Sequence, residues 1–122
     1  MESADSVIWD SCDKTPWSVA KCMYSCAQGR FRYTGAWEYW DGDKNMWIKD
    51  VHTRKLKTYM TIELYGIVLS RASYWQSKYQ ADAQQDNCRI VRLLEVCMTL
   101  QRRTLVTAII REAREFFVAD GY

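Results

Sequence analysis

The sequence has little of what loop-rich, membrane-spanning or secreted proteins depend on. It holds one proline and five glycines in 122 residues, too few of these turn-forming residues for a loop-rich module. No stretch approaches the ~18 apolar residues of a membrane-spanning helix. The first residues also lack the charged-then-apolar order of a secretory signal. We therefore expect an intracellular protein with no membrane partner.

Several motifs of catalytic and nucleotide-binding sites are also missing. No GxxxxGK[ST] segment occurs, so nothing can cradle a triphosphate as a P-loop does, and GxGxxG, HExxH and GxSxG are equally absent. A histidine-dependent triad would have to use His52, the single histidine, beside Asp50. A solvated histidine between a strand and a helix is the simpler interpretation. Four carboxylates have the spacing of solvated helix surfaces, namely Glu63, Glu95, Glu112 and Glu115. We expect no catalytic site and no cofactor in this chain.

The cysteines indicate free thiols. Cys12, Cys22, Cys26, Cys88 and Cys97 are odd in number and form no CxxC pair, which favours a reducing compartment. Cys22 and Cys26 are one helical turn apart and could share a metal. A structural zinc site needs about four ligands, however, and the only histidine is distant in the sequence. We expect buried, apolar cysteines and no metal.

The bulk composition is that of one globular domain, with 48% hydrophobic and 26% charged residues. The net charge of +2 is too small to indicate nucleic-acid binding by itself. The charge is unevenly placed, because residues 1–29 carry a net −2 and residues 30–60 a net +3. We expect residues 1–14 to be an acidic, flexible leader whose Trp9 docks on the body, and residues 15–122 to form a single domain.

The first part of that domain combines a helix with a small sheet. Thr15 and Pro16 are typical of a helix start, and the helical spacing of apolar residues continues to Gly29. Basic and aromatic residues alternate over residues 30–33, as in a half-buried strand. Two aromatic runs, residues 37–40 and 46–49, flank a glycine-containing loop and predict a β-hairpin.

The rest of the chain is predicted to be helical. Thr53 can cap a helix that continues to about Lys78, and polar residues 80–87 form a connection. Helices are expected over 88–100, with Val91, Leu94 and Met98 on one side, and over 105–118. The fold class is therefore α+β and mostly α: four to five helices with a small antiparallel, aromatic-rich β-hairpin in the N-terminal third.

One segment combines basic and aromatic side chains as single-stranded nucleic-acid sites do, where cations follow phosphates and flat rings stack on bases. The candidate cations are Arg30, Arg32, Lys44, Lys49, Arg54, Lys55 and Lys57, with Arg102 and Arg103 as a second pair in a turn. The aromatic residues of the hairpin are Trp37, Tyr39, Trp40 and Trp47. A second interpretation stays open, in which Trp37, Tyr39 and Trp47 fill the core and the cations only solvate the surface.

The order of these elements resembles a region of known viral proteins. The helix at 17–21, the strand at 30–33, the segment 36–50 with its hairpin and the closing helix at 109–117 are similar to the helical region that precedes the superfamily 3 helicase in poxvirus-like primase–helicases of large DNA viruses and phages. The resemblance covers residues 15–122. The cysteines have no counterpart in it.

The resemblance implies a linker or collar domain without a catalytic site of its own. Such a domain joins primase and helicase modules, supports ring assembly as a homo-oligomer and contacts single-stranded or forked DNA. ATP and Mg²⁺ would bind only in the neighbouring modules. The protein would then act in the host-cell cytoplasm or nucleus, at sites of viral replication. The alternative is a protein–protein interaction module, unrelated to replication, that anchors a partner with exposed Trp and Met side chains.

Overall fold

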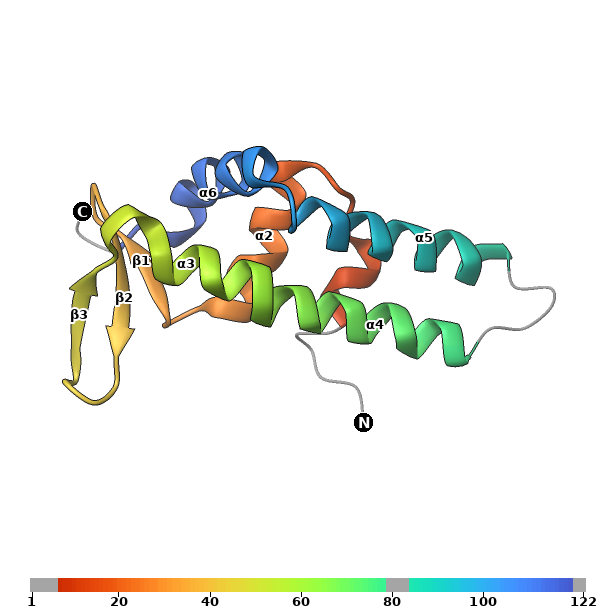
Figure 1. Ribbon diagram of the computed structural model, residues 1–122, viewed down its shortest axis with the longest axis horizontal. Coiled ribbons are helices and arrows are strands. Elements are labelled where there is room, and N and C mark those ends of the chain that lie inside the picture. Colours follow the sequence, from red (N-terminus) through yellow and green to blue (C-terminus); the bar gives the residue numbers. More distant parts are fainter. Residues whose placement is uncertain (1–6, 79–83, 120–122) are drawn as a thin grey trace.

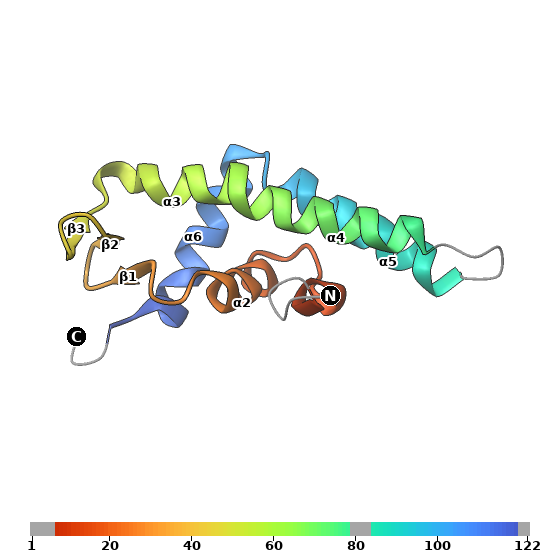
Figure 2. The ribbon, with the colours of Figure 1, turned by 90° about the horizontal axis from the view of Figure 1, so that it is seen from below.

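The computed structural model describes residues 7–78 and 84–119 and shows an elongated body with a small sheet at one end (Figure 1). About 68% of the chain is helical, so the expected mostly helical α+β class is confirmed. A long helical segment runs from the sheet to the far end of the body (Figures 1 and 2). None of the described helices is both long enough and apolar enough to cross a membrane.

The first helix, α2 (Pro16–Ala27), begins as its sequence predicts. The Thr15 side chain accepts a hydrogen bond from the backbone N–H of Ser18, and Pro16 occupies the first helical turn. Val19 and Met23 lie one turn apart on the buried face. Beyond the helix, Gly29 turns the chain toward the sheet with a positive φ of 83°, which glycine adopts without strain.

Three antiparallel strands form the sheet in the order β1 (Phe31–Tyr33), β2 (Trp37–Asp41), β3 (Met46–Lys49). The expected hairpin and the expected strand at 30–33 are therefore both present, joined in one sheet. Trp40 lies opposite Trp47, and successive side chains of a strand point to opposite faces. The face toward the helices carries Phe31, Tyr33, Trp37, Tyr39 and Ile48, and the outer face carries Arg32, Glu38, Trp40, Trp47 and Lys49.

The long helical segment follows the sheet at once. It consists of η2 (Val51–Thr53), α3 (Arg54–Thr58), a π-helical stretch η3 (Tyr59–Leu64) and α4 (Tyr65–Ser77). Its extent agrees with the sequence prediction, but its cap does not.

The residue that caps this segment is Asp50. Its buried carboxylate accepts the backbone N–H groups of Lys55 at 2.8 Å and Leu56 at 2.9 Å. Thr53 has a left-handed backbone with φ of 54°, and its side chain caps no backbone N–H. The prediction that Thr53 caps the helix is wrong because His52 and Thr53 turn the chain and carry the Asp50 carboxylate over the helix start.

The last two helices are α5 (Gln84–Thr99) and α6 (Arg103–Phe117). Both start earlier than the sequence predicts. Helix α5 includes residues 84–87 of the expected connection. The other residues of that connection, 80–83, lie outside the described part of the chain.

Helix α5 buries a different stripe from the expected one. Leu93, Val96 and Leu100 are fully buried, whereas Leu94 and Met98 are exposed, as is Val91. The two stripes lie side by side at helical spacing, and only the first is buried in the core.

The described part of the leader is built into the body. Residues 8–11 form a short turn, η1 (Ile8–Ser11), in which Trp9 is fully buried. The docking of Trp9 is thus confirmed. The expectation of a flexible leader is wrong for residues 7–14, because Trp9 and Cys12 belong to the core and Asp10 is held by Arg71. Residues 1–6 lie outside the described part.

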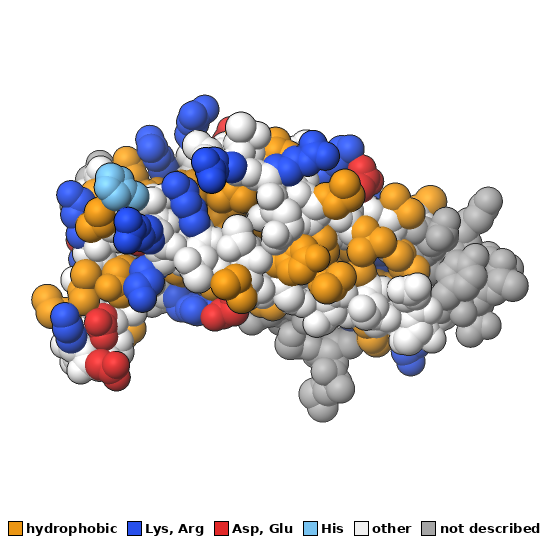
Figure 3. Space-filling model, viewed as in Figure 1, with side chains coloured by type: hydrophobic (Ala, Val, Ile, Leu, Met, Phe, Trp, Pro, Cys, Tyr) orange, Lys and Arg blue, Asp and Glu red, His pale blue; other side chains and the backbone are white. Residues whose placement is uncertain are grey.

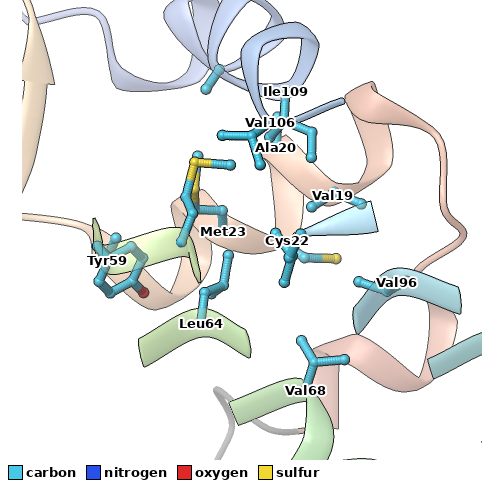
Figure 4. Packing of buried hydrophobic residues seen from close by; sticks show 14 of the residues in the cluster. Val19, Ala20, Cys22, Met23, Tyr59, Leu64, Val68, Val96, Val106 and Ile109 are labelled. Atoms are coloured by element: carbon cyan, nitrogen blue, oxygen red, sulfur yellow. The ribbon is translucent and has the colours of Figure 1, made fainter. Parts of the chain in front are cut away.

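The core lies where α2, α6, η3, α4 and α5 meet (Figure 4). The side chains labelled there come from all of these elements, and they are Val19, Ala20, Cys22, Met23, Tyr59, Leu64, Val68, Val96, Val106 and Ile109. Cys12, Cys22 and Cys97 are buried free thiols, as expected, and Cys88 is exposed. Among the described residues, no three His, Cys, Asp or Glu side chains are grouped to hold a metal.

Candidate nucleic-acid interface

The outer face of the sheet carries a pair of tryptophans. The Trp40 and Trp47 rings, opposite each other on β2 and β3, pack edge to face with centroids 5.4 Å apart. Trp40 is 41% exposed, and neither ring belongs to the hydrophobic core of the described chain. Trp47 is half-buried, so the exposed Trp40 ring supplies most of the flat apolar surface on which unstacked bases can stack.

Charged side chains flank this pair on the same face. The Arg32 guanidinium lies 4.5 Å from the Trp47 ring centroid, in cation–π contact, and its Nε donates to the Glu38 carboxylate at 2.5 Å. Glu38 faces both Arg32 and Lys49 in the strand register. Lys49 is exposed and forms no ion pair with the described residues. The face therefore combines two indoles, one guanidinium whose charge Glu38 compensates, and the Lys49 ammonium, which has no ion pair among the described residues.

The inner face of the sheet serves the core. Trp37 is buried against Tyr33 and Phe117, each with ring centroids 5.4 Å away, and Tyr39 packs at the edge of the core. The core interpretation is therefore confirmed for Trp37 and Tyr39. It is wrong for Trp47, because the register places this residue across from Trp40 and away from the helices.

Arg30 and Lys55 lie in a groove between the hairpin and α3. The groove has a volume of about 570 Å³, and Tyr39, Trp40 and Tyr59 contribute to its walls. It also contains three carboxylates, those of Asp41, Asp43 and Glu63. A groove with this mixed lining should bind a nucleic-acid backbone poorly, because the carboxylates repel the phosphates.

The Arg30 charge is already compensated by Glu63. The two side chains form a two-point ion pair, and the guanidinium lies 4.7 Å from the Tyr59 ring centroid. Hydrogen bonds from Arg30 hold the pKa of the Glu63 carboxyl below its usual value. Arg30 is therefore less free to bind a phosphate than the sequence suggests, and Lys55 rests beside the Tyr39 ring at 5.4 Å.

Helices α3 and α6 bring together cations that the sequence analysis treated separately or missed. Arg54 and Lys57 are exposed on α3, and Arg111 and Arg114 are exposed on α6. Residues from both helices line one pocket, among them Lys57, Arg111 and Arg114. Figure 3 shows Lys and Arg side chains gathered over this region. The signal for Arg111 in the sequence was its spacing of eight residues from Arg103, which places both on one face of α6.

The remaining predicted cations lie apart from these surfaces. Lys44 is exposed in the hairpin loop, where Asp41 accepts its backbone N–H at 3.1 Å. Arg102 lies at the turn between α5 and α6 and lines a groove there, and Arg103 begins α6. The predicted site residues thus form several surfaces rather than one.

An apolar groove runs between α4 and α5. It has a volume of about 530 Å³ and is lined mainly by Tyr65, Leu69, Leu94, Cys97 and Met98. Met98 is 58% exposed and Leu94 42% exposed. Hydrophobic side chains are gathered on this side of the body in Figure 3. A patch of this kind is typical of a surface that another molecule covers.

Compared with protein-family models and with curated protein sequences, the chain matches none.

Proposed function

We propose that this chain is a non-catalytic accessory domain that contacts single-stranded DNA through the outer face of its sheet. One observation carries the proposal: an exposed Trp40 and a half-buried Trp47 form an aromatic pair on the outer face, with Arg32 and Lys49 beside it. Bases stack on such rings whatever their sequence, and cations next to them attract the phosphates between the bases. The small net charge of the whole chain does not weaken this local match.

The setting that we propose is a viral primase–helicase. It rests on the resemblance of residues 15–122 to the region before the superfamily 3 helicase. In that setting the domain joins the primase and helicase modules, supports assembly of the ring as a homo-oligomer, and guides single-stranded DNA between the two modules. ATP and Mg²⁺ belong to those modules. Work on such DNA takes place at viral replication sites inside the host cell.

Salt-dependent binding of a labelled thymidine oligonucleotide tests the contact with DNA. We expect fluorescence anisotropy to show binding that weakens steeply as salt rises. Lys49→Gln should weaken binding and make the salt dependence shallower by about one phosphate contact. Lys21→Gln is the matched control, because Lys21 is exposed on α2 and lies against Trp17, away from the sheet. Binding that ignores salt, or that falls equally in both variants, would remove the DNA contact from the proposal.

The apolar groove between α4 and α5 favours a second candidate, a protein–protein interaction module. Its exposed anchors would be Leu69, Leu94 and Met98 rather than tryptophans. Purification of a tagged chain with one stoichiometric protein, lost in Leu94→Glu, together with no affinity for DNA, would favour this candidate over the first.

A further inference from the structure

A small pocket lies on the helix side of the sheet, away from the face that carries Trp40 and Trp47. It has a volume of about 190 Å³, and side chains from β2, η2, α3 and α6 enclose it. The lining residues are Trp37, Thr53, Lys57, Thr107, Ile110, Arg111 and Arg114. Three of these residues are cationic, and none carries a carboxylate.

Within residues 7–78 and 84–119, the three cations have no acidic partner. Lys57, Arg111 and Arg114 form no ion pair with any described residue, whereas Lys14, Arg30, Arg32 and Arg71 each pair with a carboxylate. Arg114 is held in place by the Tyr33 ring, with its guanidinium carbon 5.2 Å from the ring centroid. Like charges brought around one cavity repel one another, and an anion between them removes that cost.

The pocket also borders a buried donor that has no acceptor. Trp37 is only 5% exposed, and its indole Nε1–H is buried without a hydrogen-bond partner in the described chain. Leaving such a group unpaired is unfavourable, because the donor has lost its hydrogen bond to water. The two threonine hydroxyls of the pocket are already used, since Thr53 donates to the His52 carbonyl at 2.6 Å and Thr107 to the Arg103 carbonyl at 3.0 Å.

We propose that this pocket binds a phosphoryl group. Arg111 and Arg114 have the forked donors that match two phosphate oxygens, and Lys57 adds a point charge. The phosphoryl group is either the terminal phosphate of a nucleotide or strand, or a phosphodiester of a nucleic-acid backbone. The site does not require the outer face of the sheet to bind DNA.

The indole N–H signals in ¹H–¹⁵N correlation spectra give a direct test. The six tryptophans provide six such signals, and Trp37→Phe identifies the one that belongs to Trp37. Inorganic phosphate is added at constant ionic strength, with chloride replaced in proportion. We expect the Trp37 signal to shift saturably and the Trp40 and Trp47 signals to stay in place.

Matched arginine variants separate this site from general charge. In an Arg111→Gln, Arg114→Gln double variant, phosphate should bind about tenfold more weakly or worse. Arg102→Gln should bind as the unchanged chain does, because Arg102 lines the groove between α4 and α5 and not this pocket. As a second readout, phosphate should raise the melting temperature of the unchanged chain more than that of the double variant.

Two short thymidine oligonucleotides, one with a 5′-phosphate and one with a 5′-hydroxyl, then identify the source of the phosphoryl group. Tighter binding of the first assigns the pocket to a terminal phosphate, and equal binding that moves the Trp37 signal assigns it to backbone phosphodiesters. The proposal is overturned if phosphate causes no saturable shift of the Trp37 signal, or if the double variant responds like the unchanged chain. If Trp40→Ala loses oligonucleotide binding while inorganic phosphate still shifts its Trp37 signal, the result supports a pocket that is independent of the sheet face.

Discussion

Asp10 and Arg71, 61 residues apart in the chain, form a two-point ion pair that fixes the N-terminal turn to α4. The Arg71 Nε and Nη2 atoms donate to the two Asp10 oxygens at 2.8 and 2.6 Å. Trp75 adds a third bond, from its Nε1 to Asp10 Oδ1 at 2.9 Å. The Arg71 side chain is only 4% exposed, so this ion pair lies largely out of water.

We predict that Asp10→Ala destabilises the fold by about 2–3 kcal/mol, because it leaves the buried Arg71 guanidinium without its anion. Urea denaturation followed by circular dichroism measures the loss. Asp43→Ala is the control, since Asp43 is exposed in the hairpin loop, and it should change stability by less than about 0.5 kcal/mol. Equal losses in the two variants would show that the Asp10–Arg71 pair is not needed.

The same carboxylate should make stability depend on acid pH. Burial alone would raise the pKa of Asp10, but the hydrogen bonds from Arg71 and Trp75 and the charge of Arg71 hold it below its usual value. In the unfolded chain the Asp10 carboxyl titrates at about pH 3.9. The stabilisation that the ionised carboxylate gives to the fold is therefore complete above that pH, and it is lost as the pH falls through the lower pKa of the folded state.

Urea titrations between about pH 5 and pH 2 measure this dependence. We expect the stability of the unchanged chain to fall below about pH 4, and Asp10→Ala to lose less over the same range. If the two chains lose stability in parallel, the ion pair is not the cause.

The cap of the long helical segment gives a prediction that separates the structure from the sequence. Asp50→Ala removes the acceptor of the Lys55 and Leu56 backbone N–H groups and should cost about 1–2 kcal/mol. Thr53→Ala, the cap expected from sequence, should change stability by a few tenths of a kcal/mol at most. Thermal melts of both variants measure the difference. A larger loss in Thr53→Ala would contradict the cap seen here.

Adjacent leucines on α5 test which side of that helix is buried. Leu93 is fully buried and Leu94 is 42% exposed. Leu93→Ala should destabilise by about 2–4 kcal/mol through the cavity it leaves, and Leu94→Ala by less than about 1 kcal/mol. Urea midpoints of the two variants give the comparison. A reversed order would mean that α5 packs with its other stripe inward.

These residues show what the sequence could and could not predict. Local patterns decide the start of α2 at Thr15 and Pro16 and the alternation of the hairpin, and both predictions are confirmed. Helix α5 has two neighbouring apolar stripes, and the position of α4 decides which of them is buried. No pattern within the sequence of α5 indicates this choice. The prediction that Trp47 fills the core is wrong for a similar reason. The side of the sheet on which Trp47 lies depends on its pairing with Trp40, and whether that side is buried depends on which side the helices cover.

The candidate site was predictable in composition but not in arrangement. The basic and aromatic residues of 30–57 are near one another in the sequence, yet the strands divide them between two faces of the sheet. Glu38 and Glu63 compensate Arg32 and Arg30, and the sequence does not reveal these pairings. Arg111 and Arg114 join Lys57 only because α6 returns to α3.

Thiol reactivity should follow burial. Burial raises the pKa of Cys97 to about 11, and contact with Cys22 together with burial raises the pKa of Cys12, so neither forms a thiolate at pH 8. We expect Ellman's reagent to modify the exposed Cys88 first and to reach Cys12 and Cys97 only when urea unfolds the chain. Cys88→Ser should abolish the fastest phase. Fast modification of Cys12 or Cys97 in this variant, located by peptide mass spectrometry, would contradict their burial.

The central claim is that an aromatic sheet face binds single-stranded DNA, and the affinity of Trp40→Ala for a thymidine oligonucleotide tests it most directly. Base–aromatic stacking contributes about 1–3 kcal/mol per base, so this variant should bind roughly tenfold more weakly at fixed salt. Trp17→Ala is its control, because Trp17 is 46% exposed but lies on α2 against Phe116. The account predicts a loss in Trp40→Ala with Trp17→Ala unchanged, and equal affinity of all three chains would contradict it.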